Sequence, residues 1–154
     1  MPPRRRPPRD ADPLPATLRI IGGTYGGRKL LYSGDLRTRP MKERVREAIF
    51  NLISTDSKGR YALDLFAGTG ALGLEALSRG AVGATFIERH FPTAEIIRRN
   101  CAALGVEGIC HVEAANTFVW PDGSWISLPT ARRWSYFARR RMIFTLIGWT
   151  TCCD

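Results

Sequence analysis

The chain has 154 residues, an apolar fraction of 44% and a formal net charge of +9. This length suits one globular domain, and no apolar run reaches the roughly 18 residues that a membrane span needs. The positive charge favours polyanionic partners such as nucleic acid and is uneven, because residues 1–60 carry +8, residues 61–120 carry −2 and residues 121–154 carry +3.

Residues 1–16 are rich in proline and arginine and contain almost nothing that could be buried. This composition predicts a disordered arm. Its arginines (Arg4, Arg5, Arg6 and Arg9) could contact phosphates without reading sequence, although a tail that merely improves solubility is equally compatible.

Residues 18–32 read as a hairpin, with strands at Leu18–Ile21 and Arg28–Tyr32 joined by a glycine-rich turn. An extended link, Asp35–Pro40, follows, and Pro40 is placed to open a helix. From Met41 a helical repeat of apolar side chains predicts the face that packs on the core: Val45, Ala48, Ile49, Leu52 and Ile53. The remaining charged side chains of this helix suit either a solvated face or substrate contact.

The stretch Tyr61–Ala81 organises the rest of the chain. A short apolar strand, Tyr61–Phe66, leads into glycines spaced G-x-G-x-x-G and then into a helix that a basic residue and Gly80 end. Glycine permits the sharp turn and lets a ligand lie against the N–H groups at the helix start. We therefore predict the first βα unit of a nucleotide-binding α/β domain.

Two acidic residues indicate which nucleotide it binds. Asp64 stands four positions before Gly68, where a carboxylate would repel a diphosphate but can pair with the ammonium group of S-adenosylmethionine. Glu88 ends the apolar strand Ala84–Glu88, where such folds hold ribose hydroxyls. The alternatives are a purely structural turn, with Asp64 as a cap and Glu88 as a solvated strand end, and a dinucleotide-dependent oxidoreductase, which Asp64 disfavours.

Further elements follow in the same alternation. We predict a helix from about Thr93 to Leu104 with Gly105 as its stop, a strand at Gly108–Ala114, and another strand near Met142–Ile147. Asn116, just past the third strand, could reach a nucleobase edge or could be a plain turn residue.

The cysteines and histidines indicate no metal site. The four cysteines (Cys101, Cys110, Cys152 and Cys153) have no C-x-x-C spacing, and no signal peptide precedes them, so we expect reduced thiols in a soluble, cytoplasmic protein. His90 and His111 have no neighbouring ligands at metal-binding spacing.

Four segments in this order resemble the RsmD-type methyltransferases: LRIIGGTYGGRKL, the run Arg39–Asn51, DLFAGTGALGLEALSRGA and FIER. The resemblance covers Leu18 to Phe118. It implies an α/β, Rossmann-like S-adenosylmethionine-dependent methyltransferase fold with an N-terminal β-hairpin and helix. It also implies methyl transfer to N2 of a guanine in small-subunit ribosomal RNA, with that RNA or the assembling small ribosomal subunit as partner and a monomeric enzyme.

Site residues follow from the motifs and the resemblance together. The residues expected to bind S-adenosyl-L-methionine are Asp64, Phe66, Ala67, Gly68, Thr69, Gly70, Gly73, Glu88 and Asn116. At Asn116 the family usually has an Asp beside the adenine. The residues expected to contact RNA are Arg19, Arg28, Lys29, Arg39, Lys42, Arg44 and Arg46.

The resemblance stops after Phe118. Enzymes that methylate exocyclic amines of bases resemble one another in an Asp- or Asn-Pro-Pro-Tyr/Phe motif, and this chain has Pro-Pro only within residues 1–16. All four tryptophans lie within the last 35 residues, without a packing pattern. We assign no catalytic residue and expect weak or no turnover.

Three regions result: the arm at 1–16, the hairpin, helix and cofactor half at 17–120, and a divergent, poorly ordered tail at 121–154. We favour a frame change or premature stop as the origin of the tail. The alternative is a genuine C-terminus with a basic, aromatic surface for RNA. The second functional hypothesis is a catalytically dead RNA-binding module of the same fold.

Overall fold

A computed structural model of the protein describes residues 17–35, 38–117 and 143–145. The predicted arm and nearly all of the predicted tail lie outside the described residues. Within the described part, no helix is long and apolar enough to cross a membrane. The elements in chain order are β1 (Leu18–Arg19), β2 (Lys29–Leu30), α1 (Glu43–Ile53), the 3-10 turn η1 (Ser54–Ser57), β3 (Tyr61–Asp64), α2 (Ala71–Ser78), β4 (Gly83–Ile87), α3 (Phe91–Leu104), the 3-10 turn η2 (Glu107–Ile109), β5 (Cys110–Glu113) and β6 (Ile143–Thr145).

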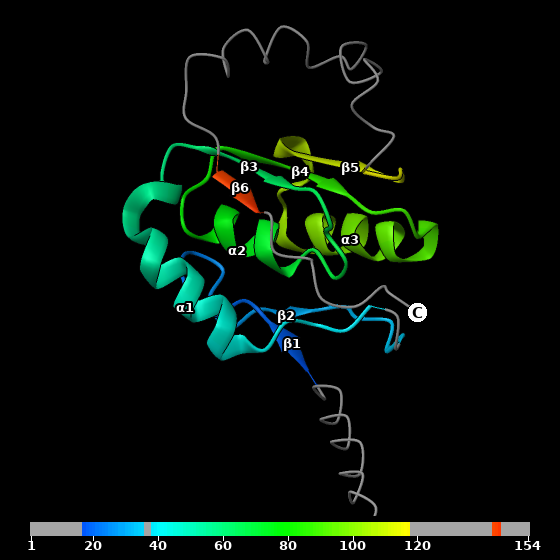
Figure 1. Ribbon diagram of the computed structural model, residues 1–154, viewed down its shortest axis with the longest axis horizontal. Coiled ribbons are helices and arrows are strands. Elements are labelled where there is room, and N and C mark those ends of the chain that lie inside the picture. The colour runs from blue at the N-terminus through cyan, green and yellow to red at the C-terminus, as the bar shows by residue number, and fades with distance from the viewer. Residues whose placement is uncertain (1–16, 36–37, 118–142, 146–154) are drawn as a thin grey trace, which may run out of the picture.

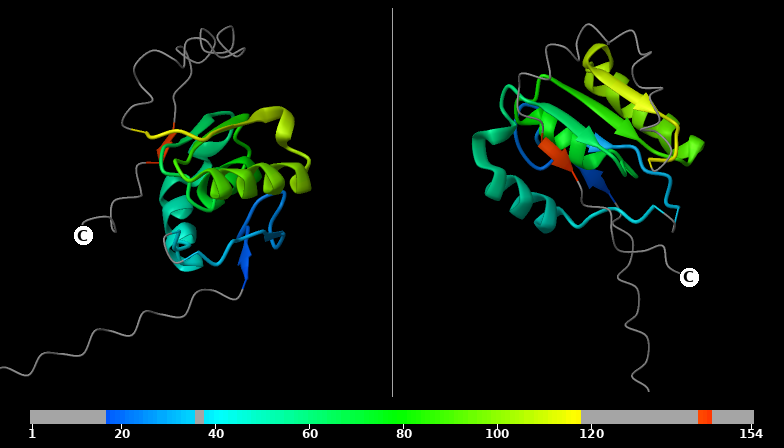
Figure 2. Two further views of the ribbon diagram at one scale, coloured as in Figure 1. Left: turned by 90° about the vertical axis from the view of Figure 1, so that its right-hand side faces the viewer. Right: turned by 45° about the horizontal axis from the view of Figure 1, so that its top comes forward.

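The centre of the fold is a parallel sheet with strand order β5-β4-β3-β6. Helices α2 and α3 follow β3 and β4 and lie on the same face of this sheet (Figures 1 and 2). Because the strands are parallel, their carboxyl ends meet at one edge, where α/β folds bind ligands. The strand predicted near Met142–Ile147 is confirmed as β6, which pairs with β3.

Helix α2 is the most deeply buried helix of the described part, whereas α3 buries only one face. Every residue of α2 is buried, and so is every residue of β4 beneath it. Both helices end as predicted on a glycine in the left-handed region, Gly80 (φ 98°) and Gly105 (φ 71°). After each glycine, the N–H of the next residue donates to the carbonyl five positions earlier. These bonds, from Ala81 N to Ala76 O and from Val106 N to Cys101 O, satisfy carbonyls of the last helical turn.

The hairpin forms a third layer on the side of α2 and α3 away from the sheet (Figure 1). β1 and β2 pair antiparallel, with Leu18 opposite Leu30 and both buried. The helices hold the hairpin through its backbone. The Asn100 side chain of α3 accepts from Leu31 N (2.7 Å) and donates to Leu31 O (3.0 Å), as a neighbouring strand would.

The strongest attachment is the carboxylate of Glu75, which is fully buried in α2. It accepts hydrogen bonds from Ile21 N (2.8 Å) and Gly22 N (2.9 Å) of the hairpin turn, and from Arg79 Nε (2.9 Å). One turn further along, Ser78 accepts from Tyr25 N through its hydroxyl (2.9 Å). The hairpin is therefore fixed to α2 by polar groups that water does not reach.

The predicted apolar face of α1 is confirmed only in part, because Ile49 packs against the core while Ala48 is exposed. Val45 and Leu52 are 40% and 87% exposed, whereas Arg46 and Phe50 are the buried residues of this helix. The reason is that α1 packs against the hairpin as well as the apolar core. The guanidinium of Arg46 donates to the carbonyl of Arg19 (2.7 Å).

We expect Glu75→Ala to destabilise the protein by about 3–5 kcal/mol, because it leaves the partly buried N–H groups of Ile21 and Gly22 and the Arg79 guanidinium without their acceptor. Urea unfolding followed by circular dichroism measures the change. Glu95→Ala is the matched control, since Glu95 lies in half-exposed ion pairs on α3 and its loss should cost less than about 1 kcal/mol. Equal losses in the two variants would contradict the assignment of Glu75 as the anchor.

Candidate cofactor site

Two acidic residues meet at the carboxyl edge of the sheet. Asp64 is the last residue of β3, and Glu88 directly follows β4, the neighbouring parallel strand. The N–H of Glu88 donates to the carbonyl of Glu113 (3.0 Å), which continues the ladder to β5. Asp64 and Glu88 are far apart in the sequence. They come together because β3 and β4 are neighbouring parallel strands that end at the same edge of the sheet, beside the glycine turn.

The three glycines of the turn have different physical roles. Gly68 (φ 51°) and Gly70 (φ 73°) adopt the left-handed backbone that other residues avoid, and Gly70 N donates to Ala67 O (2.6 Å) to close the turn. Gly73 lies inside α2, where a Cβ would come within 2.3 Å of Phe86 Cε1. This third glycine therefore allows the helix to approach β4, and the first two shape the loop.

The surface above Gly68 is open apart from one neighbour. A Cβ on Gly68 would have Thr38 Cγ2 as its nearest side-chain atom, at 3.5 Å. Thr38 belongs to the link between the hairpin and α1, so this link reaches over the glycine turn. Thr38 is absent from the predicted site residues, since a lone threonine in an irregular link carries no pattern.

Asp64 is almost inaccessible, with 2% of its surface exposed. Its carboxylate accepts a hydrogen bond from the N–H of Gly73 (3.3 Å), in the first turn of α2, and another from the N–H of Phe66. Burial raises the pKa of Asp64 to about 7, the nearby Glu88 charge adds to this rise, and the two N–H groups oppose it. Asp64 thus accepts a hydrogen bond in the first turn of α2, in agreement with the structural alternative, in which it caps that helix.

Glu88 ties the glycine turn to the start of α3. One carboxylate oxygen accepts from Gly68 N (2.9 Å) and the other from His90 N (2.8 Å). Glu88 is half-buried, and each of its oxygens has a second lone pair. The carboxylate can therefore accept hydrogen bonds from a pair of ribose hydroxyls.

The segment after β5 closes the same edge of the sheet. The hydroxyl of Thr117 donates to the carbonyl of Leu65, just past β3. Asn116, the preceding residue, is exposed beside this contact. Thr117 is a second residue that the sequence analysis missed, because its partner is 52 positions away.

The predicted RNA-binding residues are not equivalent in the structure. Arg19 forms an ion pair with Glu43 (3.0 Å), and Arg28 donates to the carbonyl of Ala103 (2.9 Å) at the end of α3. The prediction that Arg46 contacts RNA is wrong, because Arg46 is 0% exposed and cannot reach RNA in this arrangement. The other four side chains lie on exposed residues: Lys29, Arg39, Lys42 and Arg44.

Arg46 has a structural role instead. Its Nε and Nη1 have no hydrogen-bond partner in the described part of the chain, and burial lowers its pKa, which the charges of Glu75 and Glu43 oppose. The same described residues hold no group of three His, Cys, Asp or Glu side chains that could bind a metal ion.

Fold and site together define a methyltransferase-type α/β domain. A solved structure described as putative methyltransferase yhhF from Escherichia coli has a TM-score of 0.62 to this chain at 42% identity, covering 68% of this chain and 55% of that one. The putative methylase HI0767 from Haemophilus influenzae gives a TM-score of 0.54 at 33% identity, with 68% and 55% covered.

The chain belongs to the family described as conserved hypothetical protein 95, whose model matches residues 18–120. It is 47% identical over 87 residues to ribosomal RNA small subunit methyltransferase D of Escherichia coli strain K12, covering 56% of this chain and 44% of that protein. It is 41% identical over 87 residues to the putative rRNA methyltransferase YlbH of Bacillus subtilis strain 168, covering 56% and 47%. These matches confirm the RsmD-type resemblance, and they span less than half of each relative.

We expect Gly73→Ala to destabilise the protein by about 1–3 kcal/mol, because the new methyl group overlaps the Phe86 ring and α2 must move off β4. Urea unfolding measures this loss. Gly108→Ala is the matched control, since nothing lies within 4 Å of its Cβ position, and it should change stability by less than about 0.5 kcal/mol. If the two variants unfold at the same urea concentration, helix approach does not require Gly73.

We expect Asp64→Asn to stabilise the ligand-free protein at pH 8 by about 1–4 kcal/mol, and by less at pH 5. The folded-state pKa of about 7 lies above the ordinary 3.8, so the folded state binds the proton more tightly than the unfolded state does. Stability is therefore lost as the pH rises from about 4 to 7, and the neutral amide avoids that loss. Urea unfolding at both pH values measures it.

Asp56→Asn is the control for Asp64→Asn, since the Asp56 side chain is 73% exposed. Its effect on stability should be small at both pH values. A pH-independent effect of Asp64→Asn would show that Asp64 does not titrate in this range.

Proposed function

We propose that the chain binds S-adenosyl-L-methionine at the carboxyl edge of the sheet. The observation that carries this proposal is the placement of the Asp64 and Glu88 carboxylates on either side of the glycine turn, with Gly68 open to a ligand. Asp64 would favour the ammonium group and Glu88 would accept the ribose hydroxyls. A dinucleotide fits less well, because its diphosphate would lie beside two carboxylates.

We further propose small-subunit ribosomal RNA as the substrate of the family reaction, with N2 of a guanine as the methyl acceptor. The names of the relatives and the +8 charge of residues 1–60 support an RNA substrate. In this reaction guanine N2 attacks the sulfonium methyl carbon, the carbon–sulfur bond breaks, and the amine loses a proton. Such a transfer depends mainly on positioning and on an acceptor for the amine hydrogens.

A second function, RNA binding without methyl transfer, is favoured by one observation. The 154 residues contain no Asp- or Asn-Pro-Pro-aromatic sequence that would hold the amine and stack on the base. On its own, this polypeptide is therefore expected to bind cofactor and RNA and to transfer methyl groups weakly or not at all.

Isothermal titration with S-adenosylhomocysteine and NAD⁺ tests the cofactor. We expect S-adenosylhomocysteine to bind, and Asp64→Asn and Glu88→Gln each to weaken it about tenfold or more, because each loses a charge-assisted contact. Glu107→Gln, at an exposed acidic position in η2, is the control and should bind normally. Binding of NAD⁺ without S-adenosylhomocysteine would support the oxidoreductase alternative.

Methylation of undermethylated small ribosomal subunits with a labelled methyl donor tests turnover. We expect little product from this polypeptide. Robust incorporation at guanine N2 would overturn the expectation of weak activity while leaving the cofactor assignment intact.

A further inference from the structure

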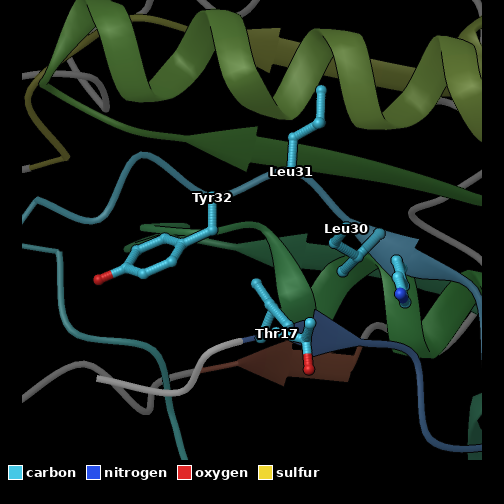
Figure 3. A pocket seen from close by; sticks show the side chains of 6 residues that line it. Thr17, Leu30, Leu31 and Tyr32 are labelled. Atoms are coloured by element: carbon cyan, nitrogen blue, oxygen red, sulfur yellow. The ribbon is translucent and has the colours of Figure 1, made fainter. Parts of the chain in front are cut away.

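The hairpin carries a cavity of about 320 Å³, at the lower end of the range for small-molecule sites. Residues of both hairpin strands and their continuations line it: Thr17, Leu18, Lys29, Leu30, Leu31 and Tyr32 (Figure 3). None of them belongs to the glycine turn or to the ends of the sheet strands. The cavity is therefore a feature separate from the candidate cofactor site.

The cavity wall is apolar and aromatic. In Figure 3 Leu30 and Thr17 lie on one side of Tyr32, whose ring points away from both, and Leu31 points toward α3. Leu30 is buried and Tyr32 is half-buried. The phenol of Tyr32 donates to the carbonyl of Asp35 (3.3 Å), which holds the ring at one end. A ring fixed in this way offers a flat surface for stacking with little loss of side-chain freedom on binding.

The rim of the cavity is positively charged. Lys29 lies directly opposite Arg19 in the hairpin ladder, and like charges in such a pair repel. Glu43 binds Arg19, and Lys29 is exposed at the cavity. Arg39 also acts on Tyr32, since its charge opposes the rise in the Tyr32 pKa that burial and Asp35 cause. An anion beside Lys29 would offset the repulsion between Lys29 and Arg19.

We propose that this cavity receives one unpaired nucleotide of a single-stranded RNA, with its base against the Tyr32 ring and its phosphate beside Lys29. A stacking surface within a basic rim is the combination that binds single strands. A second copy of this chain is a poorer occupant, because it would bring the same +9 charge to a positive rim.

This inference rests on the proposed RNA substrate and adds where one nucleotide binds. The first experiment uses the unaltered full chain and needs no variant. Fluorescence anisotropy compares a labelled single-stranded RNA of about 12 nucleotides with an abasic strand of the same length. We expect the strand with bases to bind about tenfold more tightly, since only a base can fill the cavity. Equal affinities would overturn the proposal.

The second experiment assigns that preference to Tyr32. Tyr32→Leu keeps an apolar side chain and removes the ring, so the preference for bases should fall by about tenfold. Tyr32→Phe keeps the ring and loses only the hydrogen bond to Asp35, so the preference should remain. Tyr25→Leu is the matched control, because this half-buried tyrosine lies in the hairpin turn and does not line the cavity.

The third experiment assigns the phosphate contact. Lys29→Ala should reduce the slope of log affinity against log salt by about 0.7, the loss of one phosphate contact on a single strand. Lys58→Ala removes an exposed lysine outside the hairpin and should leave the slope unchanged. An unchanged slope in Lys29→Ala would remove Lys29 from the site.

Three readouts separate the possible failures. S-adenosylhomocysteine binding by every variant reports on the cofactor proposal, which stands or falls independently of the cavity. RNA binding with equal affinity for abasic strands keeps the RNA partner and overturns the cavity. A dimer in sedimentation velocity that Tyr32→Leu abolishes would show a second copy as occupant and would also overturn the proposal.

Discussion

The architecture depends on one buried carboxylate. Glu75 is fully enclosed, and its two oxygens accept from Ile21 N, Gly22 N and Arg79 Nε. In a medium of low dielectric constant these charge-assisted hydrogen bonds are strong, and an unpaired carboxylate there would be very costly. Arg79 extends the attachment, since its guanidinium lies 5.1 Å from the ring centre of Phe50 in α1. One side chain of α2 therefore fixes the hairpin and, through Arg79, contacts α1.

This attachment gives the hairpin and its link a defined place relative to the sheet. The hairpin covers the side of α2 and α3 away from the sheet (Figure 2). The link that leaves it brings Thr38 over Gly68, at the carboxyl edge. The same attachment leaves Lys29 and Tyr32 accessible around the hairpin cavity. The basic hairpin and the glycine turn are thus parts of one packed unit.

Local patterns predicted the central unit well. The strand, glycine turn and helix around Gly68, the stop of α3 at Gly105 and the strand near Met142–Ile147 all appear as expected. These features depend on steric rules that act over a few residues. Helix α1 was different, because its apolar repeat placed Ile49 correctly on the core but included the exposed Val45 and Leu52 and left Arg46 among the surface residues. A pattern of apolar residues cannot show that a hairpin carbonyl and the Glu75 carboxylate of α2 come close to Arg46, where together with Glu43 of α1 they favour a buried arginine.

The sequence by itself determined the α/β class, the glycine turn and the two acidic residues that bracket it, because turn sterics and strand polarity are encoded within short segments. Only the tertiary structure decided the partners of Glu75 and Asn100, the burial of Arg46 and the approach of Thr38 and Thr117 to the site. These contacts join residues that lie from 27 to 69 positions apart. Whether a polar side chain is buried depends on which groups the other layers bring to it, and that is settled when the layers pack.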